Sequence, residues 1–264
     1  MSEPKLQNKK KKHVEQCQCK KGCQHPPLPG DCFCAFHRKN GCDRTSPLSG
    51  FEPPYEPLRW NTRQNIRETH NCFAYAMNVH DPKQIENCNK SEDCNVPFHQ
   101  PGYAAGWDGF TSTRLKTCTD MVGRILGDNP SMRMTTFTGK CPPTTSKIAI
   151  VVDPDEDYHF YRQDKTNMWS HKPGGTKVTN LDASKRPIYD PALANRDYTD
   201  NNGRLDYDIF CSYLCVPRQR ALHLKASGGG SYKVTRVRRR GQYRSTRVSR
   251  AVAHGRRSTR RRSD

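Results

Sequence analysis

The chain has 264 residues, a hydrophobic content of 33% and a formal net charge of +19. The low hydrophobic content predicts that part of the chain does not join a core, and the excess charge lies in residues 218–264, which hold 16 of the 45 Lys and Arg but only one acid. Residues 1–16 contain lysines without an apolar run, and 18 consecutive apolar residues occur nowhere, so the sequence indicates neither a secretory signal peptide nor a transmembrane helix.

The first predicted segments are a basic N-terminal segment (1–16) and a Cys-rich module (17–43). Six of the 13 cysteines and two histidines fall in the module, which has few large apolar residues. Something other than a hydrophobic core must therefore hold it together. The candidate residues are Cys17, Cys19, Cys23, His25, Cys32, Cys34, His37 and Cys42.

Two kinds of cross-link fit this composition. Zinc binds mixed sets of Cys and His at close spacing, and its binding energy becomes folding energy for a polar segment. The first four of the eight candidates could form one tetrahedral set and the last four another. Disulfides are the alternative if the protein matures in an oxidising compartment. We favour structural zinc, because clustered cysteines in a chain without an export signal more often bind metal.

A Pro-rich connector (44–60) leads into a predicted domain of residues 61–217. The first helix of this domain is expected to begin after Asn71, whose side chain can accept a hydrogen bond as the N-cap. A basic arm (218–264) follows the domain.

Residues 112–128 carry the clearest helical pattern. Apolar residues recur at helical spacing from Leu115 to Leu126, and Thr111 or Ser112 is the expected N-cap. Apolar runs bounded by turn residues then predict strands. These runs are residues 132–137, 147–154, 157–163, 167–172 and 206–217. Helices followed by strands predict an α+β fold with an antiparallel sheet packed on helices.

Cys72 stands at the start of a predicted helix, where the macrodipole and the N–H groups would lower the pKa of its thiol. The third and fourth predicted strands, folded as a hairpin, place His159 opposite or diagonal to His171. The two imidazoles could then serve as the base and the orienting group of a thiolate nucleophile. The alternative is a buried structural cysteine, with His171 simply hydrogen-bonded beside Trp169.

This order of residues resembles the papain-like fold in its compact NlpC-type cell-wall hydrolase form, in which a second histidine is often the third catalytic member. The resemblance covers residues 58–217 and implies that Cys72, His159 and His171 are catalytic residues of a cysteine peptidase or amidase, or of an inactive relative. Four short stretches of the sequence are also similar to a protein family of large DNA viruses, of the chlorovirus and mimivirus kind. They are HFYRQD, MWSHKPGG, VTNLDAS and IYDPALANRDY.

The basic arm begins near three glycines, Gly228 to Gly230, which predict a flexible hinge. Arginine predominates beyond the hinge, and its planar guanidinium matches phosphate. The expected partners are other capsid proteins or viral DNA, and binding to DNA would depend steeply on salt. The arginines concerned are Arg236, Arg238, Arg239, Arg240, Arg244, Arg247, Arg250, Arg256, Arg257, Arg260, Arg261 and Arg262.

Three functions fit these features. The first is a structural virion protein, a minor capsid or internal component, made in the cytoplasm of the infected cell. We favour it, because extended arms on a compact domain are typical of capsid components that become ordered on assembly. The second is an active cysteine hydrolase that uses Cys72 and His159, so the sequence leaves catalysis open. The third is a nucleic-acid-binding protein that acts through the Cys-rich module and the arm.

Overall fold

The computed structural model describes residues 15–110, 115–199, 205–226 and 232–234, so the predicted arginines of the basic arm lie outside the described residues. The helices are α1 Ala35–Asn40, α2 Pro57–Asn61, α3 Gln64–Arg67, α4 Cys72–Met77, α5 Pro82–Asn89 and α6 Cys118–Asp128. The strands are β1 Arg133–Thr135, β2 Thr145–Asp153, β3 Asp157–Gln163, β4 Trp169–His171, β5 Ile209–Pro217, β6 Leu222–Leu224 and β7 Tyr232–Val234. Across the described ranges, no helix combines the length and the apolar character needed to cross a membrane.

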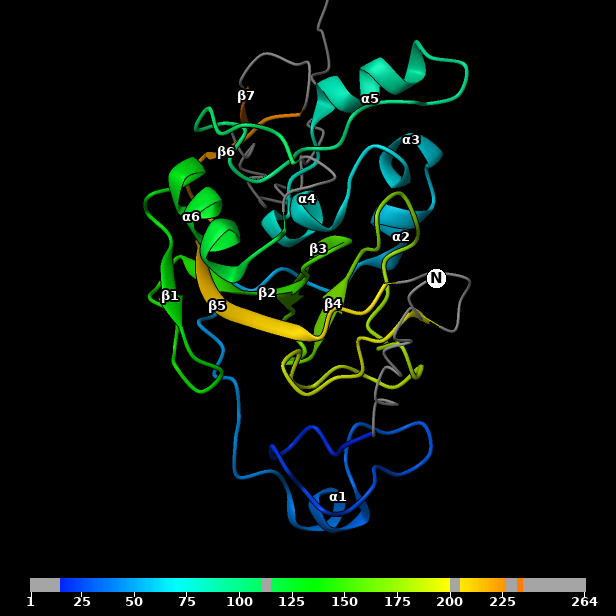
Figure 1. Ribbon diagram of the computed structural model, residues 1–264, viewed down its shortest axis with the longest axis vertical. Helices are drawn as coiled ribbons and strands as arrows, with labels where there is room; N and C mark the ends of the chain where they lie inside the picture. Colours follow the sequence, from blue (N-terminus) through cyan, green and yellow to red (C-terminus); the bar gives the residue numbers. More distant parts are fainter. Residues whose placement is uncertain (1–14, 111–114, 200–204, 227–231, 235–264) are drawn as a thin grey trace, which may run out of the picture.

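A five-stranded antiparallel sheet lies at the centre of the chain, in the order β1-β5-β2-β3-β4 (Figure 1). Strands β2 and β3 form a hairpin in which Ile150 lies opposite Phe160, and β4 returns beside β3. Strand β5 comes from the far end of the sequence and lies between β1 and β2. The predicted α+β class with an antiparallel sheet is confirmed.

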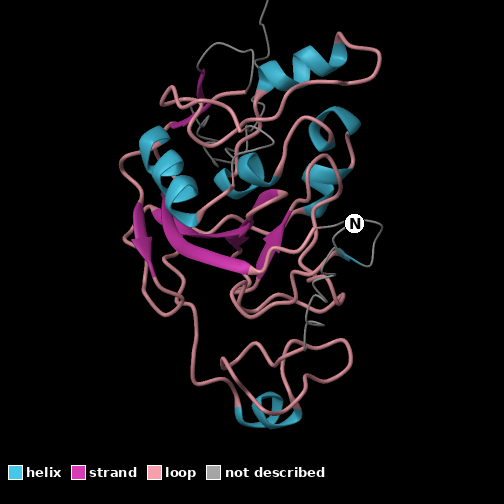
Figure 2. Cartoon of the chain, in the orientation of Figure 1, coloured by secondary structure: helices cyan, strands magenta, loops and turns pink. Residues whose placement is uncertain are grey.

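The two faces of the sheet are buried against different parts of the chain. Successive side chains of a strand point to opposite faces. Ile148 and Ile150 therefore join a core with Phe160 and with helices α4 and α6. Ala149 and Val151 join a second, aromatic-rich core on the other face. Figure 2 shows α4 and α6 on one side of the sheet and the Cys-rich module, with α1, on the other.

Helix α6 is shorter than the sequence predicted. It begins at Cys118, after the capping side chain of Thr117, whereas the predicted start lay earlier. Leu115, which was assigned to the apolar face of this helix, lies outside it and is 56% exposed. The physical reason is a tertiary contact. The backbone N–H of Lys116 donates to the carbonyl of Pro154 at 2.8 Å, so the segment before the helix is held extended against the turn after β2.

Three disulfides cross-link the sheet domain, residues 61–217. Two of them have sequence separations of 93 and 74, and both end on strand β5. They fasten helix α6 and the loop before β2 to this strand. The three bridges are Cys88–Cys94, Cys118–Cys211 and Cys141–Cys215. The predicted boundaries between the Cys-rich module, the connector and the sheet domain stay a prediction.

Candidate metal centre

Four potential metal ligands converge in the Cys-rich module. Helix α1 begins directly after Cys34 and presents His37 one turn further on, so the two side chains share one face of the helix. Cys17 and Cys23 stand on either side of the turn of residues 18–22, which precedes the helix. The backbone N–H of Cys34 donates to the sulfur of Cys17 at 3.3 Å, which holds the first turn against the helix. We call Cys17, Cys23, Cys34 and His37 the Cys/His cluster.

The ligand atoms of the Cys/His cluster all lie within 4.8 Å of one another. The Nδ1 atom of His37 is 3.2 Å from the sulfur of Cys17 and 3.2 Å from the sulfur of Cys34. It is 3.9 Å from the sulfur of Cys23, which is 4.0 Å from that of Cys34. A tetrahedral zinc ion with Zn–S bonds of about 2.3 Å separates its ligand atoms by roughly 3.5 to 3.8 Å. The cluster could therefore hold a metal ion.

The surroundings of the cluster shift the pKa values of Cys17 and Cys34 in opposite directions. Burial raises the pKa of Cys17 to about 11. Burial also opposes ionisation of Cys34, but hydrogen bonds from the backbone of His37 and from the thiols of Cys17 and Cys23 outweigh it and lower the pKa of Cys34. Metal ligands must be deprotonated, so a bound cation would replace the thiol protons of the cluster.

The division of the eight predicted ligands differs from the two sets that their spacing suggested. The Cys/His cluster takes members of both sets. Cys19 and Cys42 form a disulfide, because the chain brings their Cα atoms to 5.5 Å, and they offer no thiolate. Cys32 is buried in the second core of the sheet, and burial raises its pKa to about 12. His25 is exposed, and its ring is not among the ligand atoms of the cluster.

Cys72 opens helix α4, and its predicted N-cap is confirmed. The side chain of Asn71 accepts a hydrogen bond from the backbone N–H of Ala74 at 3.1 Å. The thiol is nevertheless buried in the core beside Phe160. Burial, followed by the charge of Asp157, raises its pKa, which corrects the predicted lowering. The reason is that desolvation of the enclosed thiol outweighs the effect of a short helix.

His159 and His171 lie together on adjacent strands. Tyr161 is the partner of His171 in the register of β3 and β4, so the two histidines are diagonal neighbours. The Nε2 atom of His159 lies 2.8 Å from Nδ1 of His171. The Nε2–H group of His171 donates to the carbonyl of Leu181 at 2.9 Å, which leaves its Nδ1 to accept from His159. Burial lowers the pKa of His171 to about 4 and that of His159 well below its usual value, so both are neutral at pH 7.

The sheet separates this histidine pair from Cys72. His159 and Phe160 are successive residues of β3, so they point to opposite faces. Phe160 packs with Cys72 on the helix-covered face, whereas the ring of His159 contacts Tyr161 and Tyr207 on the other face. The structure thus brings the two imidazoles together but does not place Cys72 within hydrogen-bond reach of its predicted base, as an active pair requires.

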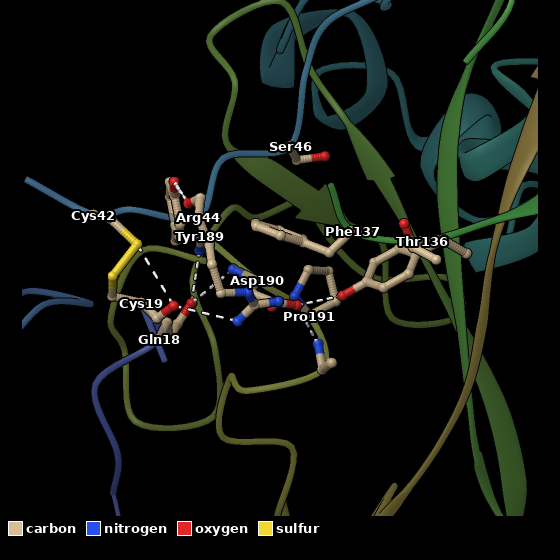
Figure 3. Close-up of polar contacts among 12 residues, drawn as sticks. Gln18, Cys19, Cys42, Arg44, Ser46, Thr136, Phe137, Tyr189, Asp190 and Pro191 are labelled. Carbon is tan, nitrogen blue, oxygen red and sulfur yellow. Dashed lines mark hydrogen bonds and ion pairs between the residues drawn. A yellow bond between two sulfur atoms is a disulfide. The ribbon is translucent and has the colours of Figure 1, made fainter. Parts of the chain in front are cut away.

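Sequence patterns did not indicate the residues that join the Cys-rich module to the sheet domain. Gln18 is 1% exposed and hydrogen-bonds to the segment around Asp190. Arg44 forms an ion pair with the same aspartate at 3.2 Å. Figure 3 shows both side chains reaching Asp190. A single glutamine has no spacing or periodicity, so no signal in the sequence could have identified it.

Comparison with known proteins connects this chain to a shell protein. It is 35% identical over 155 residues to "Insoluble matrix shell protein 1" of Ruditapes philippinarum, and the match covers 57% of this chain and 87% of the relative. No family model matches the chain. No solved structure matches it either.

This relationship corrects the interpretation drawn from short sequence phrases. The resemblance to NlpC-type cysteine hydrolases and to proteins of large DNA viruses is wrong, because the extended similarity is to a shell matrix protein. The functions predicted from that resemblance are therefore corrected as well. They were a capsid component, a cysteine hydrolase and a nucleic-acid-binding protein. The predicted location in a virion is wrong for the same reason.

Proposed function

Because the chain belongs to the family of insoluble matrix shell protein 1, we propose that it is a secreted structural protein of an insoluble shell matrix. The observation that carries this proposal is the relationship itself, since 87% of the relative is covered. The role is structural: the chain contributes a cross-linked folded unit to the matrix.

The disulfides support a location outside the cell. Four are present in the described residues, and disulfides persist in oxidising extracellular compartments rather than in the cytosol. Bridges that close long loops restrict the unfolded chain and thereby stabilise the folded one. This property suits a protein that must remain folded in a matrix without the help of cellular chaperones.

For the Cys/His cluster we propose zinc. Three sulfur ligands and one imidazole nitrogen form a closed set of four, which is the composition of structural zinc sites. Zinc would also protect the thiols. The sulfurs of Cys23 and Cys34 are only 4.0 Å apart, in a chain that already holds four disulfides, so a small movement would allow them to form a fifth in an oxidising compartment.

The matrix role is tested in the shell of the organism that encodes this chain. The mineral is dissolved in dilute acid, soluble material is washed away, and peptides of the insoluble residue are identified by mass spectrometry with and without disulfide reduction. Peptides from residues 61–217 should occur in the insoluble residue and increase after reduction. Detection of the chain only in cell extracts, together with a cytosolic marker protein, would contradict the proposal.

A further inference from the structure

One buried side chain of the Cys-rich module makes four hydrogen bonds to the sheet domain. The side-chain amide of Gln18 extends from the module into the loop that follows β4 (Figure 3). Its Oε1 atom accepts from the backbone N–H of Tyr189 at 2.7 Å and from that of Asp190 at 3.1 Å. Its Nε2 atom donates to the carbonyl of Pro187 at 3.1 Å and to a carboxylate oxygen of Asp182 at 3.4 Å. All four hydrogen-bonding positions of the amide are therefore used.

A second contact reinforces the first. The guanidinium of Arg44 donates to the carboxylate of Asp190 at 3.2 Å and to the carbonyl of Cys19 at 3.2 Å. The other carboxylate oxygen of Asp190 accepts from the hydroxyl of Tyr213 on β5. Asp190 thus connects the sheet to the module. Arg44 links the carboxylate of Asp190 to the carbonyl of Cys19, the residue that follows Gln18.

The position of Gln18 depends on sulfur chemistry on both sides. Its preceding neighbour, Cys17, belongs to the Cys/His cluster, and its following neighbour, Cys19, is bonded to Cys42. Within the module, the backbone N–H of Gln18 also donates to the carbonyl of Cys32 at 2.9 Å, whereas helix α1 buries no side chain. An unrestrained glutamine loses side-chain entropy when it is buried, besides the cost of fixing its backbone. Restraint at the flanking residues reduces the backbone part of that cost.

We infer that metal binding to the Cys/His cluster fixes Gln18 in the loop of residues 182–190, so that the Cys-rich module is a metal-dependent clasp on the sheet domain. The inference rests on the proposed zinc site. Loss of the metal releases Cys17 from the cluster, and the remaining restraints on Gln18 are the disulfide at Cys19 and the hydrogen bond from the backbone N–H of Gln18 to the carbonyl of Cys32 at 2.9 Å. The amide leaves the loop, and the backbone N–H groups of Tyr189 and Asp190 become open to water.

These two N–H groups provide the test. Hydrogen exchange is measured on the full chain with bound zinc, after treatment with a zinc chelator, and after zinc is added back. Removal of zinc should accelerate exchange at Tyr189 and Asp190 by at least about tenfold, since local opening governs exchange. Exchange in residues 147–152, inside β2, should not change. Elemental analysis of the same samples gives the zinc content per chain.

A pair of glutamine variants separates the clasp from the metal site. Gln18→Ala should accelerate exchange at Tyr189 and Asp190 while the zinc content stays the same. Gln24→Ala is the matched control, because Gln24 is an exposed glutamine of the same module, and it should change neither quantity.

The failure of the clasp and the failure of the zinc site give different results. If the chain binds zinc but exchange at Tyr189 and Asp190 does not respond to its removal, the clasp is refuted and the zinc site stands. If the chain binds no zinc and the two N–H groups are protected all the same, the zinc site is refuted and the clasp with it. A Gln18→Ala variant with unchanged exchange refutes the role of Gln18.

Discussion

The Cys-rich module and the sheet domain are held in place by different means. In the sheet domain, every residue of β2 except the first is buried, and cores cover both faces of the sheet. In the module, helix α1 buries no side chain and Phe36 is 59% exposed. The small core of the module consists of cysteines, with Phe33 packed against it. Hydrophobic burial therefore stabilises one region, and sulfur chemistry stabilises the other.

This difference shows that cysteine has two roles in one chain. In the sheet domain, bridges such as Cys118–Cys211 fasten elements that a core already holds. In the module, a disulfide and the Cys/His cluster take the place of the core. Removal of an apolar side chain should therefore affect the two regions very differently.

The largest expected effect is at a buried phenylalanine of the sheet. Phe160 is fully buried and packs on Phe73, with ring centroids 5.3 Å apart. Phe160→Ala should lower the free energy of unfolding by about 3 to 5 kcal/mol, because it removes apolar contacts and leaves a cavity. The measurement is unfolding in urea, followed by circular dichroism.

The matched change in the module is Phe36→Ala, which should alter the free energy of unfolding by less than about 0.5 kcal/mol, as is usual at exposed positions. If Phe36→Ala were as destabilising as Phe160→Ala, burial would also have to stabilise the module, and the contrast between the two regions would be wrong.

The next largest effect on the free energy of unfolding is expected in an acid titration, which compares the sheet domain and the Cys-rich module in a second way. Burial lowers the pKa of His171 from 6.5 to about 4. The unfolded chain therefore binds the proton more readily than the folded one, so this contribution to stability is complete above pH 6.5 and is lost as the pH falls towards 4. The loss amounts to about 3 kcal/mol, at about 1.4 kcal/mol per pKa unit.

The variant that tests this titration is His171→Gln. The free energy of unfolding of the wild type should fall more steeply between pH 6.5 and pH 4 than that of the variant, whatever their difference at neutral pH. Parallel curves would show that the proton does not enter at His171. In the module, protons compete with the metal for its ligands instead, so release of zinc, measured with a dye, reports the second region separately.

Local pattern was sufficient to predict the sheet. Residues 157–163 were predicted as a strand from their composition and flanking turns, and they form β3. The start of α6 was missed because it depends on a contact between Lys116 and Pro154, which are far apart in the sequence. A helical pattern cannot contain that information, since tertiary contacts override local preference.

For the candidate sites, less could be predicted from the sequence than for the sheet. Composition identified the ligand types of the Cys-rich module, but which cysteines meet depends on the path of the chain, and spacing does not determine pairing. The order of Cys72 and His159 along the chain likewise gave no information about the faces of the sheet. A shift of one residue along a strand moves a side chain to the opposite face, and His159 lies on the face that Cys72 does not occupy.

The smallest expected effect is at the beginnings of the helices. The hydroxyl of Thr117 accepts from the backbone N–H of Asp120 at 3.2 Å and caps α6, whereas α1 begins at Ala35, and the side chain of its N-cap residue Cys34 makes no capping hydrogen bond. Thr117→Ala should lower the free energy of unfolding by about 1 kcal/mol, and Thr117→Ser should retain most of the stability, because serine also caps well.

The two helices should respond to different changes, since a capping hydroxyl fixes the start of α6, whereas the proposed zinc ligand Cys34 stands at the start of α1. Zinc removal should accelerate hydrogen exchange at Arg38, whose N–H donates to the carbonyl of Cys34 at 2.9 Å, and Thr117→Ala should leave that exchange unchanged. If exchange at Arg38 were indifferent to zinc, α1 would hold its first turn without the metal. The disulfide Cys19–Cys42 would then suffice to order the module, and sulfur–sulfur bonding alone would replace its missing core.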